Sequence, residues 1–470
     1  MRLGELAPDL CPGSPVEIQG ITADSRAVAP GMIFAALKGA KLDGTAFVAE
    51  ALGRGAAAVL CEPGADVDAP VVLRDADPRR RLALIAAALA GRQPRTIVAV
   101  TGTAGKTSVA EFTRQIFAAA GHKAVSIGTL GVRGAVEIYG GLTTPDPSAL
   151  HERLAALAAA GVEHVAMEAS SHGIDQRRLD GVVLAAAGFT NIGRDHLDYH
   201  HDAESYLAAK LRLFDTLLPG GAPTVVDPDA PGADRVLAVS QKPLTVGRDG
   251  DLIRLLKARP VTTGQVLTLE CSAGRFEVTL PLIGAFQVDN ALIAAGLAIA
   301  GGVNEEAALG ALSCLKGAPG RLELVGRVRG APVFVDYAHK PDAVTAALGA
   351  VRPGVRGRLV VVIGAGGDRD AGKRPLMGEA ATEAADVVIV TDDNPRSEDP
   401  ATIRAAILAA APGAIEIGDR GEAIRAAVAM LKEGDALVVA GKGHEEGQTI
   451  AGKTIPFSDR SAVLEAIAAS

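Results

Sequence analysis

The sequence predicts an α/β protein built from three domains, two of which contain parallel sheets. Three observations lead to this fold class. Short apolar runs alternate with helix-length segments, a glycine-rich loop follows one of the runs, and the alternation starts again in the last third of the chain. The length of 470 residues agrees with three domains, because a domain commonly holds about 100–200 residues.

Chain-breaking residues mark the expected domain boundaries. The polar segment 91–95 (GRQPR) ends a helical pattern, and a Gly/Pro-rich stretch closes the middle domain near 315–320. We therefore expect domains at residues 1–91, 92–320 and 321–470. In the first domain we expect strands at 16–21, 32–36 and 57–61 and helices at 47–53 and 79–90.

The middle domain begins with a strand–loop–helix–strand unit. An apolar run at 96–100 precedes the glycine-rich loop, a helical pattern covers 106–120, and a second run follows at 124–127. This order predicts a parallel sheet carrying a phosphate-binding loop (P-loop). Further elements are expected as strands at 164–168 and 184–190 and as helices at 150–160 and 203–217.

The last third predicts a second parallel sheet, in a Rossmann-like doubly wound domain. Ligands of such sheets bind at the carboxyl ends of the strands. The expected strands cover 333–337, 359–363, 387–391 and 436–440, and the expected helices cover 340–351, 374–385, 403–411 and 420–432.

Composition excludes several classes of protein. A net charge of -8 argues against a general nucleic-acid binder. The four cysteines form no CxxC pair, which argues against a disulfide framework or a zinc knuckle. We expect no signal peptide, because residues 1–13 lack a basic start followed by an apolar run, and no membrane span, because no apolar run reaches about 18 residues. We expect a cytoplasmic monomer that binds neither nucleic acid nor membrane.

The segment 100–108 (VTGTAGKTS) carries the clearest local signal. Backbone amides of such a loop and the following helix N-terminus can bind phosphate, while Lys106 reaches the outer phosphates and the Thr107 hydroxyl contacts Mg²⁺. Val100 replaces the first glycine of the GxxxxGK[ST] pattern, so the match is to a shorter GTxGK[ST] form. A glycine turn with a surface lysine is the weaker alternative. The expected nucleotide-binding residues here are Gly102, Thr103, Ala104, Gly105, Lys106, Thr107 and Ser108.

Three further residues could take part in catalysis or metal binding, but the pattern around each of them is ambiguous. Glu168 ends an expected strand and could hold Mg²⁺, or the segment could serve as a helix cap through Ser170. His196 could ligate a metal, ordered by Asp195 and Asp198, although such a cluster is often a solvated turn. Pattern alone makes Lys210 an exposed helix lysine.

Several motifs occur together in one order. GTxGK[ST] is followed by E-x-S-S-H at 168–172, T-N-x-x-x-D-H-L-D at 190–198 and A-K-x-x-L-F at 209–214. The chain then has GRLE at 320–323, DYAHKPD at 336–342, GGDRD at 366–370 with KRP at 373–375, and GKGHE at 441–445. In these motifs the sequence resembles the Mur ligases over nearly its whole length.

This resemblance implies an ATP-dependent amide ligase of peptidoglycan biosynthesis that works through an acyl phosphate. The first domain would bind the UDP end of UDP-N-acetylmuramoyl-L-alanyl-D-glutamate, the central domain ATP, and the last domain the incoming amino acid. In such enzymes the lysine matching Lys210 is carbamylated, which converts a cation into an oxygen ligand for Mg²⁺. The resemblance implies a metal site of Thr107, Glu168, His196 and Lys210, and catalytic roles for Lys106, Lys210 and His196.

The segment 393–396 (DNPR) resembles the signature of the branch that adds meso-diaminopimelate. Arg396 can bind the distal carboxylate of that amino acid through two parallel hydrogen bonds. L-Lysine lacks this carboxylate and would bring an unpaired ammonium toward Arg396. An Asn-Pro turn with a surface arginine is the alternative. The expected pocket consists of Arg369, Asp393, Asn394, Pro395, Arg396, Gly441 and Glu445.

The remaining positions that match the family form two groups. The expected sugar-peptide contacts are Ser25, Thr143, Thr144, Ser170, Gln176 and Arg178, each of which could instead serve in a turn or a cap. The expected contacts around the nucleotide are Asn290, Arg321, Asp336 and His339. Ala104, Leu142 and Lys340 depart from the family's usual residues at their positions.

Four other functions compete with this hypothesis. The same ligase could use L-lysine, or the chain could be a folylpolyglutamate synthetase, which shares only the central and last domains. A P-loop regulator that switches partners on nucleotide binding would need neither a metal cluster nor an amino-acid pocket. A structural interaction module is disfavoured by the many polar residues at strand ends. Dependence of turnover on both a nucleotide-sugar peptide and a free amino acid discriminates among these classes.

Overall fold

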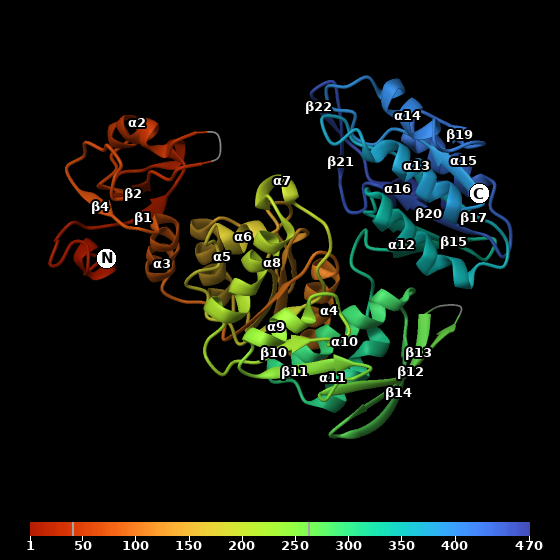
Figure 1. Cartoon of the computed structure of the whole chain (residues 1–470), viewed down its shortest axis with the longest axis horizontal. Helices are drawn as coiled ribbons and strands as arrows, with labels where there is room; N and C mark the ends of the chain where they lie inside the picture. Colours follow the sequence, from red (N-terminus) through yellow and green to blue (C-terminus); the bar gives the residue numbers. More distant parts are fainter. Residues whose placement is uncertain (40–41, 262–263) are drawn as a thin grey trace. The chain divides into compact units, whose positions relative to one another are not determined.

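The computed structural model describes residues 1–39, 42–261 and 264–470 (Figure 1). The chain forms two compact units. Unit 1 holds residues 1–254, 271–273 and 292–311, and unit 2 holds residues 255–270, 274–291 and 312–470. Within the described ranges, no helix combines the length and the apolar character needed to cross a membrane.

The first 91 residues fold around a four-stranded parallel sheet of order β1-β2-β3-β4. The strands are β1 (Gly20–Thr22), β2 (Met32–Ala35), β3 (Ala58–Cys61) and β4 (Val72–Arg74), and the longer helices are α2 (Val48–Gly53) and α3 (Pro78–Ala90). The expected strand at 16–21 is wrong in its first half. The backbone of Val16 and Ile18 bonds to Leu3 and Met1 instead, so the sheet strand starts only at Gly20.

The central sheet of unit 1 places β5 (Thr96–Thr101) between β8 (His164–Glu168) and β9 (Ala186–Phe189), and all three are parallel. The order continues as β11-β10-β9-β5-β8-β6-β7. The outer strands are β6 (Ala124–Gly128), β7 (Gly131–Gly134), β10 (Thr224–Val226) and β11 (Pro243–Gly247). Every residue of β5 is buried, as expected for a sheet covered on both faces. The carboxyl ends of β5, β8 and β9 therefore meet at one edge.

Helices α4 (Lys106–Ala119), α5 (Pro147–Ala159) and α8 (Ala203–Arg212) belong to this unit. The helix expected at 203–217 does not stay α-helical to its end. Residues 213–217 form a π-helical turn, in which Leu218 N bonds to the Leu213 carbonyl. Three strands and a long helix, none predicted from the sequence, follow as β12 (Ile253–Val261), β13 (Gly264–Cys271), β14 (Gly274–Leu280) and α10 (Ala285–Ala300).

Unit 2 contains a six-stranded sheet of order β15-β16-β20-β17-β18-β19. β16 (Ala331–Asp336), β20 (Ala436–Ala440), β17 (Leu359–Ile363), β18 (Val387–Val390) and β19 (Ile415–Glu416) are parallel, and β15 (Glu323–Val328) is antiparallel to β16. The remaining elements are α12 (Pro341–Val351), α13 (Lys373–Ala384), α14 (Pro400–Leu408), α15 (Arg420–Ala429), α16 (Asp459–Ala468) and the hairpin β21 (Gly447–Ile450) with β22 (Lys453–Pro456).

Strand β17 shows why this domain is doubly wound. Val361 and Ile363 pack into the core that contains α12, α13 and α14, whereas Val360 and Val362 pack into the core that contains α15 and α16. Alternate side chains of a strand point to opposite faces, so helices cover both faces of the sheet. The predicted fold class is confirmed, and ligands are expected at the carboxyl edge.

Candidate active site

The glycine loop connects β5 to α4 as the sequence predicts. Gly102 has φ 149° and Gly105 has φ 87°, conformations that favour glycine. A Cβ atom on Gly102 would lie 1.9 Å from the Thr190 hydroxyl oxygen, so only glycine fits there. Gly105 is the N-cap of α4, and the N-terminus of a helix attracts anions through its backbone amides.

Lys106 and Lys210 both lie at this loop. The Nζ of Lys106 donates to the Gly102 carbonyl at 2.8 Å and to the Thr103 carbonyl at 3.0 Å. The Nζ of Lys210 donates to the same Gly102 oxygen at 2.8 Å and lies 4.4 Å from the centroid of the Tyr206 ring. Lys210 is only 1% exposed, so the expectation of an exposed lysine is wrong. Burial, with the nearby Lys106 charge, holds the pKa of Lys210 well below its ordinary value.

Glu168 forms the acidic centre of the site. Its Oε2 accepts bonds from the Thr107 hydroxyl at 3.0 Å and from the Thr129 hydroxyl at 3.3 Å, and its Oε1 accepts from Thr129 N at 2.7 Å. The side chain is buried, and Gly128 leaves room for it, because a Cβ there would approach Oε1 to 2.1 Å. A hydroxyl and a carboxylate are hard oxygen donors of the type that Mg²⁺ prefers, so Thr107 and Glu168 fit this ion.

The alternative of a helix cap applies to Ser170 and not to Glu168. Ser170 Oγ accepts from Gly173 N at 3.1 Å and caps helix α6 (Ser171–Asp175). The same hydroxyl lies 3.0 Å from the Thr144 hydroxyl, which donates to the Glu168 carbonyl at 3.1 Å. Thr143 Oγ1 lies 3.0 Å from Thr129 Oγ1. The expected residues Thr143, Thr144 and Ser170 are thus linked to the strand end that carries Glu168.

His196 stands on the loop that leads to α7 (Leu197–His200). It has a positive φ of 52°, and its side chain is 47% exposed. Its Nε2 lies 3.6 Å from Asp195 Oδ2, and its ring stands 4.7 Å from that of His172. Asp195 can therefore order His196 as expected, while the side chain of Asp198 lies outside the part that the structure describes. An ammonium at Lys210 has no lone pair for a metal, so the Thr107–Glu168 pair fits the ion more directly than an unmodified Lys210 does.

Thr190 and Asn191 are functional candidates that the sequence analysis did not single out. Thr190 Oγ1 donates to the Ala104 carbonyl at 2.6 Å, and Asn191 Oδ1 accepts from Ala104 N at 3.0 Å. Both bonds use backbone atoms of residue 104, so alanine at this position keeps them. The two residues stand at the start of the TNxxxDHLD motif, and their place after β9 could have indicated this role.

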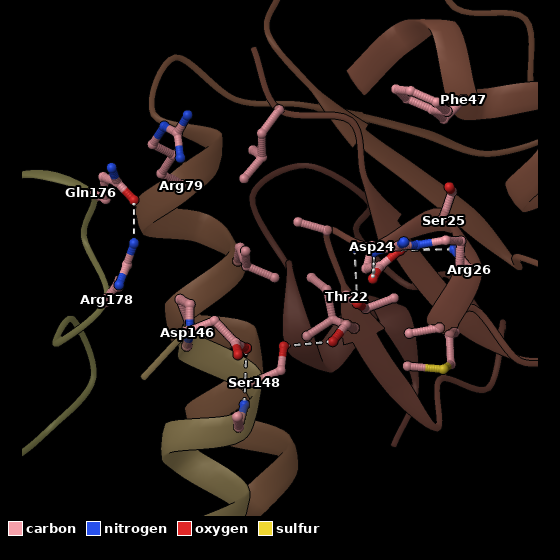
Figure 2. Close-up of a pocket in the computed structure, with 18 of the residues that line it drawn as sticks. Thr22, Asp24, Ser25, Arg26, Phe47, Arg79, Asp146, Ser148, Gln176 and Arg178 are labelled. Atoms are coloured by element: carbon pink, nitrogen blue, oxygen red, sulfur yellow. Dashed lines mark hydrogen bonds and ion pairs between the residues drawn. The ribbon is translucent and has the colours of Figure 1, made fainter. Parts of the chain in front are cut away.

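A cavity of about 1100 Å³ lies in unit 1 between the first sheet and residues 142–178. Figure 2 shows Ser25, Gln176 and Arg178 at its wall, so the structure brings these three expected residues together. Arg178 donates to the Thr144 carbonyl at 2.8 Å and to Gln176 Oε1 at 2.7 Å. Ser25 Oγ donates to Glu50 Oε2 at 2.8 Å. Polar residues that were not predicted also line the cavity, including Asp24, Arg26, Arg79, Asp146 and Ser148.

Unit 2 gathers the four residues expected around the nucleotide. Asn290 Nδ2 donates to Gln287 Oε1 at 3.2 Å, and Gln287 Nε2 donates to the Arg321 carbonyl at 3.4 Å. The Arg321 guanidinium stacks on the Tyr337 ring at 4.6 Å. Asp336 and His339 flank that tyrosine. Asp336 accepts from Leu322 N at 2.6 Å and Ala338 N at 2.7 Å, and His339 Nδ1 lies 2.8 Å from the Tyr337 carbonyl.

The expected amino-acid pocket also lies in unit 2, at the carboxyl ends of β17, β18 and β20. Asn394 Nδ2 donates to Glu445 Oε2 at 2.8 Å. Arg396 has φ 55°, and its guanidinium donates to the Gly367 carbonyl at 2.6 Å. Gly441 stands against Asp393, where a Cβ would come within 2.7 Å of Oδ2. Pro395 is buried between Asn394 and Arg396, and Arg369 is exposed on the loop after β17. The pocket thus combines a cation and a carboxylate.

A second cluster with metal-ligand chemistry lies elsewhere. Among the described residues, one group of three or more His, Cys, Asp or Glu side chains has ligand atoms within 4.8 Å of one another: His122, Glu163 and His164. Glu163 and His164 stand at the amino end of β8, whereas Glu168 stands at its carboxyl end. This cluster is therefore separate from the phosphate loop.

Three family models match successive parts of the chain. They are the Mur ligase family catalytic domain at residues 17–94, the Mur ligase middle domain at 100–298, and the Mur ligase glutamate ligase domain at 320–443.

Relatives match nearly the full chain. A UDP-N-acetylmuramoyl-L-alanyl-D-glutamate–2,6-diaminopimelate ligase of Mesorhizobium japonicum is 59% identical, over 96% of this chain and 95% of its own length. A ligase of the same name from Agrobacterium fabrum is 57% identical, over 96% and 94%. A solved structure with that name superposes with a TM-score of 0.75 at 34% identity, covering 100% of this chain and 99% of the other.

A structure of Mycobacterium tuberculosis folylpolyglutamate synthase, complexed with ADP and AMPPCP, shares the fold alone. Its TM-score is 0.63 at 20% identity, and the match covers 77% of this chain and 92% of the other. The matches to three successive family models and to relatives at almost full length are far more extensive. On these grounds the chain belongs to the Mur ligase family.

Proposed function

We propose that the protein is an ATP-dependent ligase that joins meso-2,6-diaminopimelate to the D-glutamate side-chain carboxylate of UDP-N-acetylmuramoyl-L-alanyl-D-glutamate. One observation carries most weight: the loop with Lys106, the buried Lys210 and the Thr107–Glu168 pair converge at one sheet edge. The names of relatives at 57–59% identity support the choice of substrates. The reaction serves peptidoglycan synthesis, and we place it in the cytoplasm and in a monomer.

Each of the three domains would bind a different part of the substrates. Residues 1–91 bind the UDP end of the substrate, residues 92–320 bind ATP, and residues 321–470 bind the amino acid. The cavity near Ser25 supports the first role, because it offers polar groups and the cations Arg26, Arg79 and Arg178 to a diphosphate.

The reaction begins with transfer of the γ-phosphoryl group of ATP to the D-glutamate carboxylate, which releases ADP. Lys106 and the loop amides stabilise the charge on the transferring group. The amino group of diaminopimelate then attacks the acyl carbon, loses a proton, and displaces phosphate to leave an amide. Activation is needed because a carboxylate oxygen is a poor leaving group, and exclusion of water protects the intermediate from hydrolysis.

A magnesium ion, when bound, would neutralise phosphate charge during transfer. Thr107 and Glu168 would hold it, with His196 and a carbamylated Lys210 as further ligands. The family resemblance implies carbamylation, and the burial of Lys210 against the loop supports it. A buried ammonium beside Lys106 is costly, whereas a carbamate would replace one of the two like charges by an anion.

Recognition of the amino acid would depend on Arg396 and Glu445. Diaminopimelate ends in a zwitterionic head whose carboxylate suits Arg396 and whose ammonium suits Glu445. Asp393, Asn394, Pro395 and Gly441 shape the pocket around them, and Arg369 adds a cation at its rim. The L-lysine alternative would leave Arg396 without a carboxylate partner, so it is the less favoured substrate.

The decisive experiment measures phosphate release by the purified protein with ATP, Mg²⁺ and the nucleotide-sugar dipeptide. Three arms contain meso-diaminopimelate, L-lysine or no amino acid. Release only with meso-diaminopimelate is expected. Preference for L-lysine would keep the ligase reaction but refute the role given to Arg396. Release that is independent of any amino acid would favour a nucleotide-switched regulator.

A further inference from the structure

Lys442 is a buried cation directly beneath the amino-acid pocket. Its side chain is 0% exposed. The Nζ donates to Asn394 Oδ1 at 3.0 Å and to Glu445 Oε2 at 3.3 Å, and it lies 3.7 Å from Asp393 Oδ1. A lysine is seldom buried fully unless its charge is paired, because desolvation of an ammonium costs several kcal/mol. All three of its partners belong to the expected pocket.

The bond from Lys442 determines which way the Asn394 amide faces. Asn394 Oδ1 accepts from Lys442 Nζ and from Thr449 N, each at 3.0 Å. An amide oxygen accepts and an amide nitrogen donates, so the reverse orientation would set donors against donors. The NH₂ group must then point to Glu445, where it donates to Oε2 at 2.8 Å.

The same arrangement uses one oxygen of Glu445 and leaves the other for a ligand. Within the described residues, both side-chain bonds to Glu445 that involve Asn394 and Lys442 fall on Oε2. Oε1 can therefore accept from an ammonium group. Lys442 also balances charge in the interior of the pocket, where the carboxylates of Asp393 and Glu445 are matched by the cations of Lys442 and Arg396. Arg369 at the rim is exposed, so solvent screens its charge. An interior of zero net charge suits a zwitterionic head better than a lone ammonium.

We propose that Lys442 is a positioning and specificity-determining residue, which fixes Asn394 and Glu445 for the distal head of diaminopimelate and disfavours L-lysine. This inference rests on the proposed function. Removal of the Lys442 charge leaves the interior of the pocket with an excess negative charge, which attracts the ammonium of L-lysine. A Lys442 variant should therefore show a changed preference between meso-diaminopimelate and L-lysine, in addition to a weaker affinity for meso-diaminopimelate.

The test compares Lys442→Met with the wild type in steady-state kinetics. We expect the KM for meso-diaminopimelate to rise by about 10-fold or more, and the KM for ATP to stay within about twofold. The ratio of kcat/KM for meso-diaminopimelate to that for L-lysine should fall by about 10-fold. Lys432→Met, at an exposed lysine of the same unit, is the matched control and should leave all values unchanged.

Two further variants keep the test valid if Lys442→Met does not fold. Lys442→Gln retains a donor for Asn394 but no charge for Glu445, so it should lower the selectivity ratio with a smaller change in KM. In a double-mutant cycle with Asn394→Ala, the KM effects should be non-additive, because Lys442 acts through Asn394. Additive effects, or an unchanged selectivity ratio in a folded variant, overturn the inference.

The wild-type arm separates this inference from the proposed function. Wild-type turnover that does not depend on meso-diaminopimelate would refute the proposed function and this inference with it. Wild-type turnover that does depend on it, together with unchanged selectivity in the Lys442 variants, would refute the inference alone.

Discussion

Lys106 and Lys210 donate to the same acceptor, the carbonyl oxygen of Gly102, each at 2.8 Å. Two ammonium groups on one oxygen repel each other, and one of them is almost fully buried. The lower pKa of Lys210 follows first from this burial and then from the Lys106 charge. A neutral amine is nucleophilic toward carbon dioxide, so the lowered pKa of Lys210 supports the proposed carbamylation.

The first prediction concerns this modification. Protein equilibrated with ¹³C-labelled bicarbonate should show a carbamate resonance by ¹³C NMR, and Lys210→Met should lack it. Because the pKa of Lys210 is lowered, its neutral form is present at lower pH than that of an ordinary lysine. The resonance should therefore persist at neutral pH and weaken as the solution is acidified. A carbamate resonance present in both the wild type and Lys210→Met, or absent from both, would contradict this assignment.

The second prediction separates the two ends of strand β8. Glu168→Gln removes the carboxylate proposed to hold Mg²⁺, and should lower the rate of phosphate release by about 100-fold or raise the Mg²⁺ requirement. Glu163→Gln changes the same residue type next to the amino end of the strand, and should leave both values unchanged. Titration of activity against Mg²⁺ provides the measurement. Equal effects at the two positions would argue against the metal site.

The third prediction tests the close approach at Gly102. Gly102→Ala places a methyl group against Thr190 in a strained backbone conformation, and should weaken ATP binding by about 100-fold. Gly349→Ala lies in helix α12, where an added Cβ meets no atom within 4 Å, and should raise stability by about 0.5–1 kcal/mol. Isothermal titration with ATP and thermal unfolding distinguish these outcomes.

The fourth prediction tests the cavity in unit 1. Arg178→Lys keeps the charge but loses the planar fork whose two separate nitrogens bond to the Thr144 carbonyl and to Gln176, so the KM for the nucleotide-sugar dipeptide should rise by about 10-fold. The KM for meso-diaminopimelate should not change. A variant that loses kcat alone would indicate that Arg178 does not contact this substrate.

The fifth prediction concerns His444. Burial, reinforced by the Arg321 charge, lowers its pKa from 6.5 to about 4. The unfolded chain therefore binds a proton at a higher pH than the folded chain. Stability from the neutral imidazole is complete above pH 6.5 and falls by about 3 kcal/mol as pH approaches 4. NMR titration should show one imidazole, absent from His444→Asn, that stays neutral down to about pH 5. Protonation of that imidazole near pH 6.5 would refute the prediction.

Local sequence pattern was sufficient for the elements that position the site. The loop between β5 and α4, the strand ending at Glu168, and the four strands and four helices expected in the last domain lie close to where their apolar periodicity predicts. β15, β19, α16 and the β21–β22 hairpin were not predicted. The strands and the helix of residues 253–300 could not be predicted in this way. The side chains of β12, for example, are mostly exposed and show no clear alternation of buried and exposed positions.

The burial of Lys210 could have been predicted from the helical periodicity of its own segment. It stands four residues after Tyr206 and three after Leu207, both buried, so it lies on the apolar face of α8. That periodicity predicts burial for any residue at this position. What no local pattern could supply is its partner, since the Gly102 carbonyl is 108 residues earlier in the chain.

The conformation of the phosphate loop therefore depends on residues outside the loop. Its backbone at Ala104 is held by Thr190 and Asn191, which are 86 and 87 residues away in the chain, and its Gly102 carbonyl is held by Lys210. A chimera that received only residues 100–108 would inherit the glycines without the groups that shape them. Transfer of the loop to another protein would also require Thr190 and Asn191 at the end of β9, and the buried Lys210.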